Sequence, residues 1–173
     1  MADTPLVSIL MGSDNDYAVM VEAAKILKQF DIPFEMTVSS AHRTPERTAK
    51  IVGSARERGV RVLIAGAGAA AHLAGVCAAE TTLPVIGVPI DSSCLEGLDA
   101  LLATVQMPAG IPVATMAIGA AGARNAGIFA AQILGSSDSV VATKLADFKK
   151  EMAGGVEKKA ASLAEQLKKD GLA

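Results

Sequence analysis

A repeated alternation of short apolar runs with amphipathic segments is the feature that most restricts the fold of this chain. Residues 6–11 form an apolar run, and from Tyr17 to Leu27 apolar side chains recur at helical spacing. Further apolar runs, each followed by a helical pattern, occupy residues 34–38, 60–65, 85–88 and 113–117, and their helices begin near Thr44, His72, Leu95 and Gly122. Because parallel neighbouring strands need a crossover connection, this repeat predicts a parallel sheet with helices on both faces.

We therefore expect a three-layer α/β fold with a parallel five-stranded sheet. Its expected strand order is the flavodoxin- or Rossmann-like 2-1-3-4-5. Residues 1–155 are predicted to form a single α/β domain and residues 156–173 a C-terminal helical tail. In this region Asp138–Met152 predicts an amphipathic helix, and Lys158–Lys169 predicts a second helical segment after Gly154 and Gly155. The sequence allows two arrangements of this tail, packing across a neighbouring subunit or partial fraying.

The composition is that of one globular domain that does not bind nucleic acid. The chain has 173 residues, 51% of them hydrophobic, and a formal net charge of −2. This length and hydrophobic content allow a substantial core and exclude a disordered chain. The basic residues are scattered and aromatic residues make up only 3% of the chain. Such a sequence lacks the cationic surface and the stacking side chains that nucleic-acid binding requires.

The sequence also predicts a cytoplasmic protein without a metal site. Cys77 and Cys94 are the two cysteines, and neither has a Cys or His partner at metal-ligand spacing. The N-terminal residues lack the basic start and apolar stretch of a secretory signal. Two uncharged stretches, 62–79 and 100–123, are interrupted by Gly and Pro and are rich in weakly apolar Ala. They favour buried strands and helices over a membrane span.

Polar residues gather in the loops that follow the first three predicted strands. These loops are residues 12–16, 39–45 and 66–72. In an open parallel sheet, ligands bind beyond the carboxyl ends of the strands, where the strand order reverses. With the order 2-1-3, the three loops are expected to converge on one crevice.

The first two loops offer both helix caps and ligand-binding groups. Ser13, Asn15 or Asp16 can cap the following helix, and the same groups can bind a ligand. In the second loop, Thr44 is predicted to cap a helix through its hydroxyl, with Pro at the first helical position. Arg43 then lies beside the positive end of a helix, which suits a phosphate, whereas the alternative is an ion pair with a surface carboxylate. His42 has a side chain whose pKa suits proton transfer in both directions.

The third loop allows three interpretations. Residues 66–71 match the pattern G-x-G-x-x-G/A after a strand, and Asp91 lies where a ribose-binding acid belongs in a dinucleotide site. An NAD-linked oxidoreductase is therefore one hypothesis, although this fingerprint normally follows the first strand. A second is a glycine loop that closes its backbone amides over a small anion. Tight packing of strand against helix explains the small residues but not His72.

Several motifs together resemble the PurE family of purine biosynthesis. They comprise residues 11–16 (Met-Gly-Ser-Asp-Asn-Asp), 40–45 (Ser-Ala-His-Arg-Thr-Pro), 65–73 (Ala-Gly-Ala-Gly-Ala-Ala-Ala-His-Leu), 87–89 (Gly-Val-Pro) and 106–113 (Gln-Met-Pro-Ala-Gly-Ile-Pro-Val). The resemblance runs from about Val7 to Leu134 with the motifs in the same order. Within the family, residues 70–73 and 106–108 favour the class I branch. That branch is the N5-carboxyaminoimidazole ribonucleotide mutase, which moves a carboxylate from the exocyclic nitrogen to C4 of the imidazole.

The resemblance implies a role for each candidate site residue. His42 matches the general acid and base, Ser13 and Arg43 match the phosphate-binding positions, and Asp16 matches the position that binds the ribose hydroxyls. Residues 66–68 and His72 match the loop that encloses the imidazole and its carboxylate. The full predicted substrate-binding set is Ser13, Asn15, Asp16, Ser40, Ala41, Arg43, Gly66, Ala67, Gly68, His72 and Leu73.

The resemblance also implies partners and leaves alternatives. It implies a homo-oligomer, an octamer, that uses no metal or organic cofactor and that works with an ATP-dependent synthetase supplying its ribonucleotide substrate. The sequence departs from the family pattern at Asn15, where serine is common, at Ala69, where glycine is frequent, and at Ala74, where proline is usual. The alternatives are a direct CO2-dependent carboxylase of aminoimidazole ribonucleotide, the NAD-linked oxidoreductase, and a nucleotide-binding module without catalytic activity.

Overall fold

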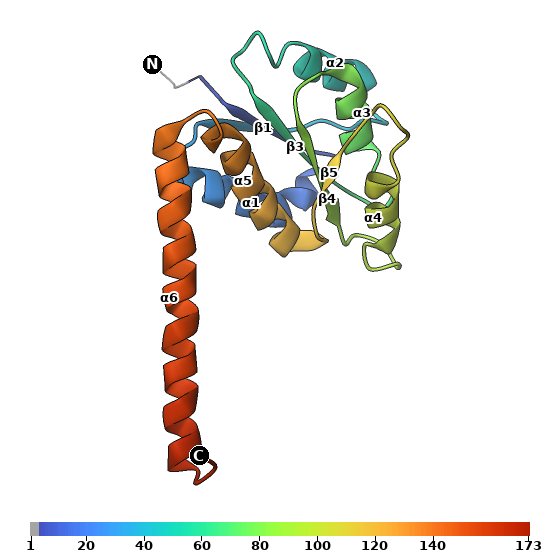
Figure 1. Cartoon of the computed structure of the whole chain (residues 1–173). Coiled ribbons are helices and arrows are strands. Elements are labelled where there is room, and N and C mark those ends of the chain that lie inside the picture. The colour runs from blue at the N-terminus through green and yellow to red at the C-terminus, as the bar shows by residue number, and fades with distance from the viewer. Residues whose placement is uncertain (1–3) are drawn as a thin grey trace.

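The computed structural model describes residues 4–173 and contains the predicted five-stranded parallel sheet (Figure 1). The strands are β1 (Val7–Met11), β2 (Phe34–Val38), β3 (Val62–Gly68), β4 (Val85–Ile90) and β5 (Ala114–Thr115). Their order is β2-β1-β3-β4-β5, which confirms the predicted topology. In the register, Met11 pairs with Val38 on one side and with Gly66 on the other. The carboxyl ends of β1 and β2 therefore lie level, and β3 continues past them to Gly68.

Helices cover both faces of the sheet. The helical elements are η1 (Asp14–Asp16), α1 (Tyr17–Gln29), α2 (Pro45–Gly53), α3 (Leu73–Glu80), α4 (Leu98–Val105), α5 (Gly119–Gly135) and α6 (Ser139–Lys169). Figure 1 shows α1 and α5 on one side of the sheet and α2, α3 and α4 on the other. One buried cluster joins α1 and α5 to one face of the strands, and a second joins α2 and α3 to the other face.

Burial on both faces explains the uninterrupted apolar runs of the sequence. All residues of β1 and of β4 are buried. Successive side chains point to opposite faces, so Ile9 packs in the cluster under α1 and α5, whereas Leu10 packs in the cluster under α2 and α3. A strand enclosed in this way has no position for a charged side chain.

The structure differs from the sequence-based expectation at several element boundaries. β3 continues to Gly68, so the two glycines predicted to open a loop lie within the strand. Helix α5 begins at Gly119, ahead of the expected Gly122, and α4 begins at Leu98, after the expected Leu95. Glycine is a weak marker here because it can occupy a strand or a helix whenever the surrounding residues favour that element.

A single helix replaces the two expected C-terminal segments. α6 runs without a break through Gly154 and Gly155, which were expected to separate two helices. Asp138 caps it by accepting hydrogen bonds from the amides of Val140 and Val141. Its first turns pack on the domain, where Phe148 meets Phe30 edge to face at a centroid distance of 5.5 Å. The remainder projects away from the domain (Figure 1). The division at residues 155 and 156 stays a prediction.

Within residues 4–173, no helix combines the length and the apolar character that crossing a membrane would require.

Candidate active site

A cavity of about 350 Å³ lies at the carboxyl ends of the strands. It is lined by Gly12, Ser13, Asn15, Asp16, Ser40, Ala41, His42, Arg43, Ala67, Gly68, Ala70, Leu73 and Ser92. The three loops that the sequence predicted to converge therefore share one cavity. Of the predicted site residues, Gly66 and His72 are not among those lining it.

The first loop combines a helix cap with the cavity wall. Ser13 begins the short helix η1, and its Oγ accepts a hydrogen bond from the amide of Asn15 at 3.3 Å. In return, the amide of Ser13 donates to Oδ2 of Asp16 at 2.9 Å. Capping and exposure to the cavity, which the sequence left as alternatives, thus occur in the same loop.

Asp16 is a buried carboxyl group at the cavity, with 7% of its surface exposed. Burial raises the pKa of Asp16 above its ordinary value, because the charged form loses hydration. Hydrogen bonds from the backbone of Ser13 and Gly12 oppose this rise, and the charge of Asp14 adds to it. Although Asp16 precedes α1, its side chain does not cap that helix. The carboxylate therefore remains directed at its own loop and at the cavity.

The second loop is closed by hydroxyl contacts in a way that the sequence did not indicate. Pro45 is the first residue of α2, as predicted, but the Thr44 side chain does not cap the helix. Its Oγ1 instead donates to the carbonyl of Ser40 at 3.0 Å and accepts from the amide of Ser40 at 3.1 Å. Oγ of Ser40 accepts from the amide of Arg43 at 3.2 Å. The predicted Thr44 cap is wrong because a partner four residues earlier competes for the hydroxyl.

Arg43 presents a cation to the cavity. Among the ion pairs formed by residues 4–173, none involves Arg43, so the alternative of a pairing with a surface carboxylate finds no support. Arg43 lies two residues before Pro45, which begins α2, and the unpaired amides of a helix N-terminus carry a partial positive charge. Two positive groups side by side favour a doubly charged anion such as a phosphate.

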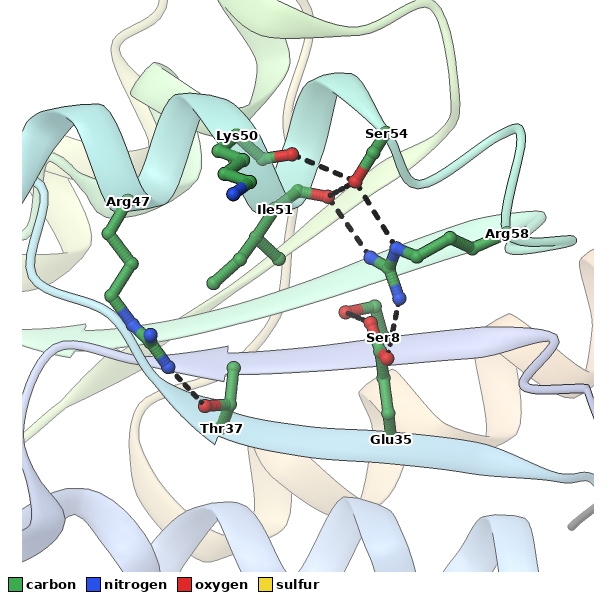
Figure 2. Close-up of polar contacts among 8 residues, drawn as sticks. All are labelled: Ser8, Glu35, Thr37, Arg47, Lys50, Ile51, Ser54 and Arg58. Atoms are coloured by element: carbon green, nitrogen blue, oxygen red, sulfur yellow. Dashed lines mark hydrogen bonds and ion pairs between the residues drawn. The ribbon is translucent and has the colours of Figure 1, made fainter.

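Polar contacts at both ends of α2 hold this helix, and with it the second loop, against β2 (Figure 2). Near its start, Arg47 donates from Nη2 to Oγ1 of Thr37 at 3.2 Å. Past its end, Nη1 of Arg58 forms an ion pair with Oε2 of Glu35 at 2.6 Å, and Oε1 of Glu35 accepts from the buried Ser8 at 2.8 Å. Arg58 also donates to the carbonyl of Ile51 in α2 at 3.0 Å. These contacts fix the direction in which residues 39–44 leave the sheet.

The two histidines of the chain are hydrogen-bonded to each other. Nε2 of His42 lies 2.9 Å from Nδ1 of His72, and the rings meet edge to face with a centroid distance of 4.9 Å. His42 follows β2, whereas His72 is the N-cap residue of α3. One ring nitrogen must donate and the other must accept, so this bond couples the tautomers of the two rings. It is lost when both rings are protonated. His72, which follows β3, thus holds the His42 side chain across the end of β1.

The third segment places a strained residue between β3 and α3. Ala69 has a φ of 50°, in the left-handed region that a Cβ disfavours by about 1–2 kcal/mol. Gly66 lies three residues before Ala69, within β3, and packs against Met20. A Cβ built on Gly66 would come within 2.2 Å of Sδ of Met20. In a dinucleotide fingerprint the glycines open the turn from strand to helix. Here Gly66 and Gly68 lie within β3, so the geometry does not favour that interpretation.

Sequence reasoning missed three residues of the cavity wall. Gly12 and Ala70 lie beside predicted residues, whereas Ser92 comes from the loop after β4. The rule that found the first three loops, applied to the fourth strand, would have found Ser92. Asp91, considered for a ribose-binding role, is exposed and does not line the cavity.

Among residues 4–173, no group of three or more His, Cys, Asp or Glu side chains is placed to hold a metal ion.

Comparison with known proteins identifies the family. The sequence model of the AIR carboxylase family matches residues 6–154. The chain is 54% identical over 164 residues to the N5-carboxyaminoimidazole ribonucleotide mutase of Pyrococcus horikoshii, covering 95% of this chain and 92% of that one. It is 57% identical over 141 residues to the mutase of the same name from Bacillus subtilis, covering 82% and 87% of the two chains.

A solved structure agrees with the sequence matches. The crystal structure of Treponema denticola PurE superposes with a TM-score of 0.84 at 27% sequence identity, covering 92% of this chain and 98% of that one. The match to the family model over most of the chain and the sequence identity to these relatives show that this chain belongs to the AIR carboxylase family.

Proposed function

We propose that this protein is an isomerase of purine biosynthesis, converting N5-carboxyaminoimidazole ribonucleotide to 4-carboxy-5-aminoimidazole ribonucleotide. The observation that carries the proposal is the position of His42 and Arg43, adjacent in the chain and both on the wall of one 350 Å³ cavity. A proton-transferring imidazole therefore lies beside a phosphate-binding cation. The relatives that are 51–57% identical bear the name of this mutase.

The proposed reaction moves CO2 and one proton within the substrate, and overall it neither consumes nor releases either of them. The bond between the exocyclic nitrogen and its carboxylate breaks, releasing CO2, and the nitrogen takes a proton from the His42 imidazolium. C4 of the electron-rich imidazole then attacks the CO2, forming a carbon–carbon bond. Neutral His42 removes the proton from C4 and returns to its starting state. These steps require no metal or organic cofactor.

The remaining cavity residues bind the substrate and retain CO2. Arg43 and Ser13 bind the 5′-phosphate, and Asp16 accepts hydrogen bonds from the ribose hydroxyls. His72 positions the His42 ring through their shared hydrogen bond. The walls around the imidazole exclude water, which matters because an escaped CO2 would end the cycle. The contributing residues are Asn15, Ser40, Ala41, Ala67, Gly68 and Leu73, with Gly66 behind them.

We further propose an octamer in the cytoplasm that receives its substrate from an ATP-dependent N5-carboxyaminoimidazole ribonucleotide synthetase. Support for self-association comes from apolar side chains in and before α4 that are about half exposed, namely Leu95, Leu98, Leu102 and Val105. A patch of this kind on a small domain indicates a protein interface. Cys77 and Cys94 are both free thiols, which suits a reducing compartment. Sedimentation that shows only monomers would contradict the assembly.

The decisive experiment supplies N5-carboxyaminoimidazole ribonucleotide without ATP and without added bicarbonate. We expect the C4 carboxylate to form, and isotope-labelled CO2 in the solvent to stay out of the product, because the released CO2 is recaptured in the cavity. Product that appears only from aminoimidazole ribonucleotide plus CO2 would instead indicate the direct carboxylase. Absence of product from either substrate would refute both reactions.

A further inference from the structure

Ser92 places a free hydroxyl group on the cavity wall. It lies two residues after the end of β4 and is exposed to the cavity. Among the hydrogen bonds formed by residues 4–173, none uses its Oγ, whereas Oγ of the neighbouring Ser93 accepts from the amide of Leu95 at 3.1 Å. Ser93 therefore stabilises the loop, and Ser92 keeps both its donor and its acceptor for a ligand.

The position of this hydroxyl follows from its contact with the end of β3. A Cβ built on Gly68 would lie 1.8 Å from Oγ of Ser92, so the hydroxyl occupies the space that this glycine leaves. Ser92 is thus held against the strand that precedes His72, the hydrogen-bond partner of His42. Its own strand, β4, lies three places along the sheet from β2, the strand that leads into the loop with Arg43. At about 4.8 Å per strand, the two strands lie roughly 14 Å apart.

We infer that the Ser92 hydroxyl binds the carboxylate group that the reaction moves. This inference rests on the proposed function. With the phosphate at Arg43 and Ser13, the imidazole end of the nucleotide must extend away from β2 and toward β3 and β4. The His42 ring already reaches past the end of β1 to His72, which follows β3, and Ser92 is the hydroxyl side chain that the neighbouring β4 loop adds to the wall. A serine hydroxyl donates well to a carboxylate oxygen and stays protonated at neutral pH, so it orients the group without taking its proton.

The role assigned to Ser92 is that of a specificity-determining residue. Its hydroxyl distinguishes a carboxylated imidazole from the bare aminoimidazole that forms when CO2 is lost. A merely structural role, filling the gap above Gly68, would affect both ligands equally. The two roles therefore differ in the ratio of two affinities and not in either affinity alone.

The test compares two nucleotides that differ only in the carboxylate. Dissociation constants of 4-carboxy-5-aminoimidazole ribonucleotide and of aminoimidazole ribonucleotide are measured by calorimetry for the wild type, Ser92→Ala and Ser93→Ala. We expect Ser92→Ala to weaken binding of the carboxylated nucleotide about tenfold, the scale of a hydrogen bond to a charged group, and to leave the other nucleotide within about twofold. Ser93→Ala, which removes a loop contact, should not change the ratio.

Each result bears on one of the two proposals. An equal loss for both nucleotides in Ser92→Ala, or no loss for either, would overturn the role of Ser92 while leaving the mutase reaction intact. A change of the ratio in Ser93→Ala as large as that in Ser92→Ala would also overturn it, because the loop and not the hydroxyl would then be responsible. A wild-type protein that binds neither nucleotide would refute the proposed function itself.

Discussion

Two pairs of glycines lie in contrasting surroundings. Gly66 and Gly68 lie among the last three residues of β3, and Gly154 and Gly155 lie in the middle of α6. A Cβ on Gly66 would come within 2.2 Å of Met20, and one on Gly68 within 1.8 Å of Ser92. A Cβ on either α6 glycine would meet no heavy atom within 4 Å. The missing side chain is therefore essential for packing in β3 and makes no such contribution in α6.

This difference shows where the structure of the chain is tightly determined. At the carboxyl end of β3, Met20 of α1 and Ser92 of the β4 loop both approach the strand closely, and Ser92 also lines the cavity. In the part of α6 beyond Phe148 the side chains are exposed almost throughout, including the apolar Met152, Val156 and Leu163. Changes at the strand end should therefore alter activity, and changes in this part of the helix should alter only local stability.

The largest effect is expected from a substitution that removes the proton-transferring imidazole at the cavity while keeping a side chain of similar shape. We expect His42→Asn to lower kcat at least about a hundredfold, the scale of a general acid and base, while the nucleotide still binds. Steady-state kinetics and calorimetry would measure the two quantities separately. Near-normal turnover would remove His42 from the mechanism. Loss of binding together with turnover would show that the residue holds the cavity in shape.

Gly68→Ala tests the crowding itself. The new methyl group would strike Oγ of Ser92 and would lie 2.9 Å from the carbonyl of Ile90, so the β4 loop must move. We expect a loss of about 1–3 kcal/mol in the free energy of unfolding, the usual cost of overpacking, and a raised KM. Urea unfolding and steady-state kinetics would measure both.

Gly53→Ala provides the matched control for this change. Gly53 ends α2 and has no heavy atom within 4 Å of a built Cβ. We expect Gly53→Ala neither to lower the free energy of unfolding nor to change the KM. Equal effects of the two substitutions would contradict the role given to close packing at β3.

A smaller effect is expected from Asp16, in the pH dependence of the free energy of unfolding. Burial raises the pKa of Asp16, so the folded state favours the protonated carboxyl. Its stabilising contribution is fully present below the ordinary value of 3.8 and is lost as the pH rises through the raised value. The difference in unfolding free energy between the wild type and Asp16→Asn should therefore fall as the pH rises across this window. Urea titrations at a series of pH values would measure it, and a difference that grows with pH would contradict the assigned cause.

The sheet and the convergence of its loops could be predicted because their signals are local in the sequence. An apolar run, a polar loop and a helical pattern each span a few residues, and the parallel topology follows from their repetition. The polar residues 13, 16, 42 and 43 are recognisable because they follow strands, wherever those strands lie in the sheet. The cavity confirms that these loops meet, whereas the roles of the individual residues stay predictions.

The remaining features depend on contacts between residues that are distant in the chain. The bond between His42 and His72 requires β2 and β3 to lie on either side of β1, and no local pattern specifies its geometry. The hydroxyl of Thr44 had two possible partners, a helix amide and Ser40, and the sequence does not rank them. Glycine gave the poorest guidance. In β3 and in α6 it predicts a turn or a break, yet in both places the regular backbone continues through it.

The smallest effect is expected in α6, where Gly154→Ala combined with Gly155→Ala should stabilise the helix. Alanine favours a helix over glycine by about 1 kcal/mol per residue, and there is open space for both methyl groups. Because this half of α6 projects from the domain, the gain should appear as slower amide hydrogen exchange around residues 150–160, with turnover unchanged. Weakened self-association or lowered activity would contradict the contrast between the β3 and α6 glycines. Either result would mean that a second copy packs against Gly154 and Gly155 as closely as Ser92 packs against Gly68.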